Sequence, residues 1–399
     1  MLIQNANLVD VISGEIIPDQ AVRTDKSGKI SEIGKTSTIS RSGKPGEEVL
    51  DLQGHYLFPG LISCHTHLSV VFPFSLTDPN EDAAVTAYRA AQRAREALDS
   101  GITTIRSVHE QNQVDLALRQ ANLAGWFNGP RIFGAGRAIS TPEGHGKGSA
   151  CSYAEGFEGF YKAAKEELAA GADHIKIFIT GGLARAGESP ENPEMTDDEI
   201  SGAVKAAEES NTYVVAHAGE SVAILQALRL GVRSFEHGYV MNQETVDAMA
   251  AKNVFYSPTL CVTRSESWMR EKGFEESSIQ NCLAVSDRHL KSVKLAIKAG
   301  LRMTNGTDYP PGDMVDGVSA ALHELFLMHG AGLSTLKSLQ SITSTAASLL
   351  GQSQQLGQVK KGFYGDFIAL PENPLYSPDS LRTIELVIQS GKVVRNDLK

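Results

Sequence analysis

The middle of the chain alternates between short runs rich in β-branched residues and longer amphipathic segments. The short runs occupy residues 61–67, 101–108, 131–136, 174–181, 212–218, 231–238, 253–259 and 301–308. Apolar runs of this length, bounded by turn residues, are typical of buried strands. Most of the segments between them, such as 287–300, space their apolar residues as on one face of a helix, and several end on Gly, as helix C-caps do.

Eight strand–helix repeats over about 290 residues predict an α/β fold, a (β/α)8 TIM barrel, whose usual size is about 250 residues plus insertions. A doubly wound open sheet is the alternative architecture. It fits less well, because no Gly-rich phosphate-binding turn follows the first predicted strand.

The two ends of the chain differ from the middle. They contain short strand-like runs separated by turn residues, among them "MLIQNANLVDV" and "TIELVIQSGKVVR". Neither end has enough apolar residues for a large core of its own. We therefore expect residues 1–58 and 357–399 to form a small β-sandwich domain jointly, and residues 59–356 to form the barrel.

The 399-residue chain has an ordinary globular composition, with 41% hydrophobic and 21% charged residues. The net charge of −10 argues against nucleic acid as a partner, because phosphate contacts require clustered Lys and Arg. No apolar run approaches the about 20 residues that span a bilayer, and the N-terminus lacks a signal-peptide pattern. The four cysteines are widely spaced, without a C-x-x-C pair, which predicts reduced thiols. We expect a cytoplasmic protein without a membrane partner.

Two histidines interrupt the first buried run, "PGLISCHTHLSV". Residues i and i+2 of a strand face the same side, so His65 and His67 point together near the carboxyl end of the first barrel strand. Catalytic groups of such barrels sit at this end. Taken alone, the pair is equally compatible with core or surface histidines.

Four further strands place chemically active residues at matching ends. Strand four carries Lys176, an ammonium inside an apolar run, where an unpaired charge is costly. Strands five, six and eight end with His217, His237 and Asp308. Imidazole and carboxylate are ligands of zinc and similar divalent metals, so the convergence predicts a metal site at the barrel mouth.

The ordered motifs "CHTHL", "HIKIFITGG", "AHA", "EHG" and "NGTD", framed by "DLQGHYLFPGLI" and "VIQSGKVV", resemble the amidohydrolase superfamily over essentially the whole chain. "KIFITGG" and "GVRSFEHG" are most similar to its metal-dependent dipeptidase and carboxypeptidase branch, which includes Xaa-Pro dipeptidases, arginine carboxypeptidases and hydrolases of amide xenobiotics.

The resemblance implies a binuclear centre of two divalent metals, taken to be zinc, bridged by Lys176 carboxylated on its amine. The other ligands divide between a buried metal and a more exposed one: His65, His67 and Asp308 for the first, His217 and His237 for the second. The implied activity is hydrolysis of a C–N amide bond of a dipeptide, N-acyl amino acid or similar small amide. The resemblance further implies that the metals would supply hydroxide to attack the carbonyl, with Asp308 as general base and then acid. The resembled branch commonly forms homo-oligomers.

Two other functions stay open. One is a one-metal deaminase or a cyclic-amide hydrolase of the same superfamily, favoured by the letters "HAGE" at 217–220. The bridging Lys176 argues against the one-metal case, which does not need it. The other is a non-catalytic scaffold, which usually lacks several ligands, whereas all six candidate positions are filled here.

Loop residues give candidates for contact with the substrate. His145 lies in the Gly-rich loop "STPEGHGKG" after strand three, where the resembled branch has a histidine that contacts the substrate carbonyl or the tetrahedral intermediate. Arg185 lies in "ARAGESPENPEMT" (184–196), which is placed to cover the site, and a guanidinium can bind a substrate carboxylate. A solvated side chain is the alternative for both residues.

Three positions after strands five and six bear on specificity. Glu220 either opens the helix after strand five, where a carboxylate favours the positive end of the dipole, or contacts substrate. Gly219 stands where many relatives carry an aromatic residue or histidine, and Tyr239 either compensates for it or packs. His109, after strand two, either lines the pocket or lies on the surface, and we expect the surface position.

Overall fold

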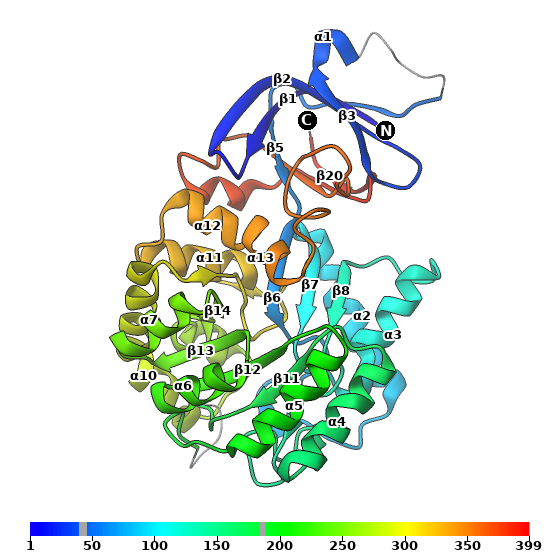
Figure 1. The fold of residues 1–399 in the computed structure, drawn as a ribbon. Helices are drawn as coiled ribbons and strands as arrows, with labels where there is room; N and C mark the ends of the chain where they lie inside the picture. The colour runs from blue at the N-terminus through cyan, green and yellow to red at the C-terminus, as the bar shows by residue number, and fades with distance from the viewer. Residues whose placement is uncertain (40–45, 184–187, 399) are drawn as a thin grey trace.

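The computed structural model describes residues 1–39, 46–183 and 188–398. The chain folds into a barrel of strands wrapped by helices and a separate sheet at one end that contains both termini (Figure 1). Eight strands build the terminal sheet: β1 (Leu2–Asp10), β2 (Glu15–Thr24), β3 (Ile30–Lys35), β4 (Val49–Asp51), β5 (Tyr56–Pro59), β18 (Phe367–Leu370), β19 (Leu386–Gln389) and β20 (Lys392–Asn396).

The terminal sheet joins the two ends of the chain through β5 and β18. These strands pair antiparallel, with Leu57 opposite Ala369, and the sheet order is β20-β19-β18-β5-β1-β2-β3, with β4 beside β1. Side chains alternate between two cores. Leu57 and Ala369 pack inside the terminal sheet, whereas Phe58 and Ile368 pack against the barrel. One sheet therefore contributes to the core of the terminal domain and covers the end of the barrel at which β6 begins.

The barrel strands are the eight predicted from the alternation of apolar runs. They are β6 (Leu61–Thr66), β7 (Ile102–Ser107), β8 (Arg131–Gly134), β11 (Ile175–Phe178), β12 (Val214–Glu220), β13 (Ser234–Val240), β14 (Phe255–Ser257) and β15 (Arg302–Met303). The ladder pairs among them are parallel. Backbone hydrogen bonds close the circle, from Asp173 N to Gly134 O (2.8 Å) and from Cys64 N to Asn305 O (2.7 Å). The expected TIM barrel with a terminal β domain is confirmed.

Short strands lie in the connecting segments: β9 (Ile139–Ser140), β10 (Ser152–Tyr153), β16 (Met314–Val315) and β17 (Val318–Ser319). The helices of the described residues are α1 (Thr36–Ile39), α2 (Ala83–Asp99), α3 (Val114–Leu123), α4 (Gly156–Ala170), α5 (Asp197–Glu209), α6 (Ser221–Leu230), α7 (Gln243–Ala251), α8 (Cys261–Arg264), α9 (Glu266–Glu271), α10 (Glu276–Ala299), α11 (Ala320–Gly330), α12 (Thr335–Ser341) and α13 (Ser344–Leu349), with 3-10 turns η2 (Phe74–Leu76), η3 (Gln111–Gln113) and η4 (Pro378–Thr383).

The helix ends follow local sequence rules. Thr196 and Glu199 form a reciprocal capping box at the start of α5, and Gly171 and Gly300 end α4 and α10 with left-handed backbone. Helix α10 extends further towards the N-terminus than the apolar pattern of 287–300 indicates, because Ile279 and Cys282 continue its buried face.

All four cysteines are buried thiols. Within the described ranges, every helix is too short or too polar to cross a bilayer.

Candidate metal centre

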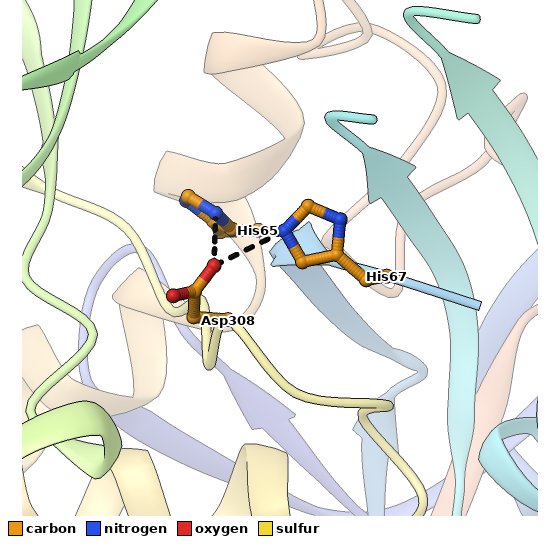
Figure 2. A group of neighbouring side chains, drawn as sticks. All are labelled: His65, His67 and Asp308. Carbon is orange, nitrogen blue, oxygen red and sulfur yellow. Dashed lines mark hydrogen bonds and ion pairs between the residues drawn. The ribbon is translucent and has the colours of Figure 1, made fainter. Parts of the chain in front are cut away.

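The carboxyl end of β6 brings its two histidines against the segment after β15. Figure 2 shows His65, His67 and Asp308 turned towards one another. Asp308 Oδ1 lies 2.9 Å from His65 Nε2 and 3.1 Å from His67 Nε2. Ligand atoms of all three residues fall within 4.8 Å of one another, which is the spacing of donors around one metal ion.

The orientation of His65 is fixed from behind by a buried ion pair. Its Nδ1 donates to Glu236 Oε2 at 2.6 Å, and Glu236 Oε1 accepts from Arg106 at 2.8 Å. Because Nδ1 carries the proton in the neutral ring, Nε2 offers a lone pair. That lone pair faces an Asp308 oxygen that is also an acceptor, in a geometry that makes no hydrogen bond.

His67 is also held through Nδ1, which donates to the carbonyl oxygen of His109 at 3.0 Å, while its Nε2 lies 3.1 Å from Asp308 Oδ1, within hydrogen-bonding distance. With both ε nitrogens deprotonated, the three residues offer three acceptor atoms at one point, and each imidazole is held through its other nitrogen. This is the arrangement by which proteins orient histidine ligands, so the residues fit a divalent metal ion.

Charges in the centre favour an anionic carboxylate. Burial raises the pKa of Asp308, but His65 and His67 outweigh it and hold that pKa well below its ordinary value. Burial likewise opposes ionisation of Glu236, but Arg106 and His65 keep its pKa low. For His67, burial lowers the pKa and Asp308 raises it, with a net increase. The carboxylates of Asp308 and Glu236 are therefore both anionic and suited to pair with a cation.

The other three expected ligands line the same cavity. Lys176, His217 and His237 share it with His65, His67 and Asp308. The rings of His217 and His237 lie 4.4 Å apart, with His217 Nε2 3.1 Å from Gly181 O and His237 Nδ1 2.7 Å from Thr259 Oγ1. Their ring nitrogens lie outside the tight group formed by His65, His67 and Asp308.

Lys176 has an unusual environment for an amine. The side chain is buried and makes no hydrogen bond or ion pair with any residue in the described ranges, with Nζ 5.5 Å from the centre of the Phe178 ring. Burial lowers the pKa of Lys176 to about 8. A substantial fraction of this amine is therefore neutral near physiological pH.

Two of the expected ligands occupy left-handed backbone, His237 with φ 70° and Asp308 with φ 65°. Such strain persists only where the surroundings enforce it. The carbonyl of His237 accepts from the Tyr256 hydroxyl (2.6 Å) and from His289 Nε2 (3.0 Å). The amide of Asp308 donates to the carbonyl of His65. Backbone anchors thus aim both side chains into the mouth of the barrel.

The remaining predicted site residues fall into different places. The ring of His145 stacks on His217 with centroids 4.3 Å apart, and its Nδ1 lies 2.8 Å from Glu188 Oε2. Tyr239 is buried and stacks on His237 at 5.2 Å. Glu220 caps α6, accepting from the amides of Val222 and Ala223 at 2.7 Å each. Arg185 lies outside the described residues.

Two glycines are required by close approach near these residues. A Cβ on Gly219 would lie 2.3 Å from the carbonyl oxygen of Pro190, so the segment after β11 occupies the space that a side chain would need. A Cβ on Gly306 would lie 2.5 Å from the Cβ of His65. Gly219 therefore leaves no room for a side chain at this position, because the backbone of Pro190 occupies that space.

Three residues that help to build the metal centre were not identified from the sequence. His109 is buried rather than on the surface, because its ring lines the cavity and its carbonyl holds His67. Glu236 lies in the motif "EHG", which was interpreted only through His237, and Arg106 lies in none of the quoted motifs. The cost of an unpaired charge inside an apolar strand singled out Lys176, and the same reasoning applied to these two residues would have suggested their pairing.

The family model for the amidohydrolase family matches residues 56–394. The chain belongs to the amidohydrolase family. It is accordingly an enzyme that hydrolyses C–N bonds, and its His65–His67–Asp308 group is the metal site of a member of this family. The resemblance seen in the sequence motifs is confirmed.

Several relatives match this amidohydrolase along most of its length. Ochratoxinase of Aspergillus niger is 28% identical over 349 residues, which cover 80% of this chain and 71% of the relative. Its crystal structure superposes with a TM-score of 0.85, 25% identity and coverage of 99% and 95% of the two chains.

Prolidases also share the whole architecture. A prolidase complexed with N-methylphosphonate-L-proline has a TM-score of 0.89 at 27% identity, covering 99% of each chain. A Xaa-Pro dipeptidase with methionine bound in its active site has a TM-score of 0.88 at 28% identity, also covering 99% of each chain.

Replacing Glu236 with Gln should weaken metal binding by about 10–100-fold, because the amide no longer supplies the charge that holds His65 with Nδ1 protonated. Competition against a chromophoric chelator measures the affinity. The exposed Glu244→Gln on α7 is the matched control and should bind metal like the parent. Equal affinities for both variants would show that Glu236 does not position His65.

Proposed function

We propose that the protein hydrolyses the C–N amide bond of a dipeptide, an N-acyl amino acid or a similar small amide. The convergence of His65, His67 and Asp308 at the barrel mouth carries this proposal. Its support is the full-length likeness to a prolidase and a Xaa-Pro dipeptidase, and the match to ochratoxinase. A small-molecule amide is then the partner of the site.

In this proposal, two zinc ions occupy the cavity. His65, His67 and Asp308 would hold the first, His217 and His237 the second, and carboxylated Lys176 both. When bound, such metals lower the pKa of water and polarise a carbonyl group. The ligands of the first ion are supported by the close grouping of their acceptor atoms. The ligands of the second ion are supported by the cavity that they share with the first group.

Carboxylation suits the environment of Lys176. The neutral amine adds CO2 with formation of an N–C bond and release of a proton, which gives an anionic carbamate. This product supplies two acceptor oxygens in a place where the ammonium has no partner among the described residues. The lowered pKa of Lys176, about 8, favours the reactive form.

Asp308 is suited to move the proton. Its side chain is 19% exposed, so the carboxylate reaches the cavity from which water and substrate arrive. The anionic form can accept the proton of the attacking water and deliver it to the leaving amine. His145 borders the same cavity, which supports a role in donating to the substrate oxygen.

A one-metal deaminase receives less support. Both carboxylate oxygens of Glu220 accept backbone amides of α6, so the group that would protonate a ring nitrogen is already engaged. A cyclic-amide hydrolase is the second candidate, favoured by 25% identity over 397 residues to imidazolonepropionase of Acinetobacter baumannii. We further propose that the protein is cytoplasmic and forms a homo-oligomer. Analytical ultracentrifugation measures the oligomeric state.

Asp308→Asn should lower kcat about 100-fold or more for every amide that the parent cleaves, because the amide cannot accept the proton. Amine release from a dipeptide and N-acyl amino acid library by the zinc-loaded protein provides the measurement. Asp316→Asn, at an exposed carboxylate just after β16, should retain activity. A parent that cleaves imidazolonepropionate but no linear amide would favour the second candidate instead.

Lys176→Ala should reduce the bound metal from about two equivalents per chain to about one, since it removes the shared ligand. Metal analysis after gel filtration gives the content. Lys205→Ala, on the exposed face of α5, is the control. One equivalent of metal in the parent, unchanged in the variant, contradicts the binuclear centre.

A further inference from the structure

Two cavities meet at the metal centre, and Phe74, His145, His217 and Asp308 line both. One, here called the apolar chamber, has walls of Leu183, Val262, Met269, Phe274, Cys282 and Tyr309. The other, the polar chamber, includes Thr77, His109, Gln111 and Ser149. A substrate reacting at Asp308 thus has two different environments within reach.

The apolar chamber has partly exposed hydrophobic side chains beside the metal centre. Met269 and Cys282 are buried, whereas Phe74 and Phe274 remain partly exposed. These two rings meet edge to face with centroids 6.4 Å apart. A bound apolar group would remove their exposed faces from water, which is favourable. No Lys or Arg of the described ranges lines this chamber.

The polar chamber contains two hydrogen-bonding atoms that the protein leaves unused. His109 is 5% exposed, and its Nδ1 accepts from the amide of Ala138 at 3.0 Å. The proton of this neutral ring is therefore on Nε2, which has no partner among the described residues. The hydroxyl of Thr77 is also buried without a partner. The buried Thr77 hydroxyl is costly unless an acceptor reaches it.

We propose that the two chambers sort the two halves of the substrate. The apolar chamber takes a bulky apolar group, and the polar chamber takes an acceptor oxygen, of a carbonyl or a carboxylate, bound by His109 and Thr77. The substrate class is then an amide joining a ring-bearing or branched apolar group to a group with such an oxygen. This inference rests on the proposed amide hydrolysis.

Phe274→Ala should lower kcat/KM at least about 10-fold for dipeptides with Phe or Leu, with little change for Ala-Ala, because only large groups reach this wall. Each residue is tested on either side of the scissile bond. The matched control is Phe127→Ala, a half-buried ring after α3, which should leave all rates unchanged. An equal loss for Phe and Ala substrates would overturn the role of the apolar chamber.

Thr77→Val keeps the side-chain shape and removes the hydroxyl, so it should lower kcat/KM about 10-fold for substrates with the acceptor oxygen. It should not affect matched analogues that lack this oxygen, and comparison of free acids with methyl esters and amides separates carboxylate from carbonyl recognition. The control is Thr345→Val on α13. A loss that is independent of the acceptor contradicts the proposal.

Fluorescence tests the apolar chamber without catalysis. The chain has two tryptophans, and Trp268 lies behind the chamber, 5.9 Å from Phe274. In a background with the exposed Trp126 changed to Phe, benzylphosphonate should change Trp268 emission saturably, and methylphosphonate should not. If benzylphosphonate binds but no amide is cleaved, the proposed function fails and the chamber stands. If amides are cleaved without preference for apolar groups, the chamber assignment fails and the function stands.

Discussion

The buried ion pair between Arg106 of β7 and Glu236 of β13 is the interaction on which the metal centre depends. It joins three strands, because Glu236 accepts from His65 of β6 and Arg106 also donates to the carbonyl of Cys64. A buried pair of this kind adds little net stability compared with apolar side chains of the same size. Its contribution is positional. It fixes which nitrogen of His65 carries a proton and where the other nitrogen points.

Closure of the barrel assembles the rest of the ligand set. The first strand and the segment after the last strand meet through the His65 carbonyl, which accepts from the amides of Thr307 and Asp308. Gly306 allows this approach, since any Cβ would collide with His65. The same seam that completes the barrel therefore forces Asp308 into its left-handed backbone and against both histidines. Closing the barrel therefore also brings Asp308 and the two histidines together.

The sequence predicted the barrel and the convergence of His65, His67 and Asp308 because both depend on short-range patterns. Strand and helix periodicity located the eight repeats, and the strand ends placed these three residues, with His217, at one cavity. Glu236 and His109 were missed because their roles depend on partners far away in the chain: Glu236 contacts His65, and His109 contacts Ala138. The extension of α10 was missed because its buried residues face a core assembled from several separate segments.

The division of labour between strands and connections explains how one metal centre can serve many substrates. The expected ligands lie at strand ends or directly after them, where parallel ladders hold the backbone. The chamber walls come from elsewhere: Phe74 from η2, Val262 from α8 and Met269 from α9. None of these elements donates a ligand to the centre. Substitutions in them can therefore reshape the space around the scissile bond while the geometry of His65, His67 and Asp308 stays fixed, because the ion pair behind His65 belongs to the strands alone.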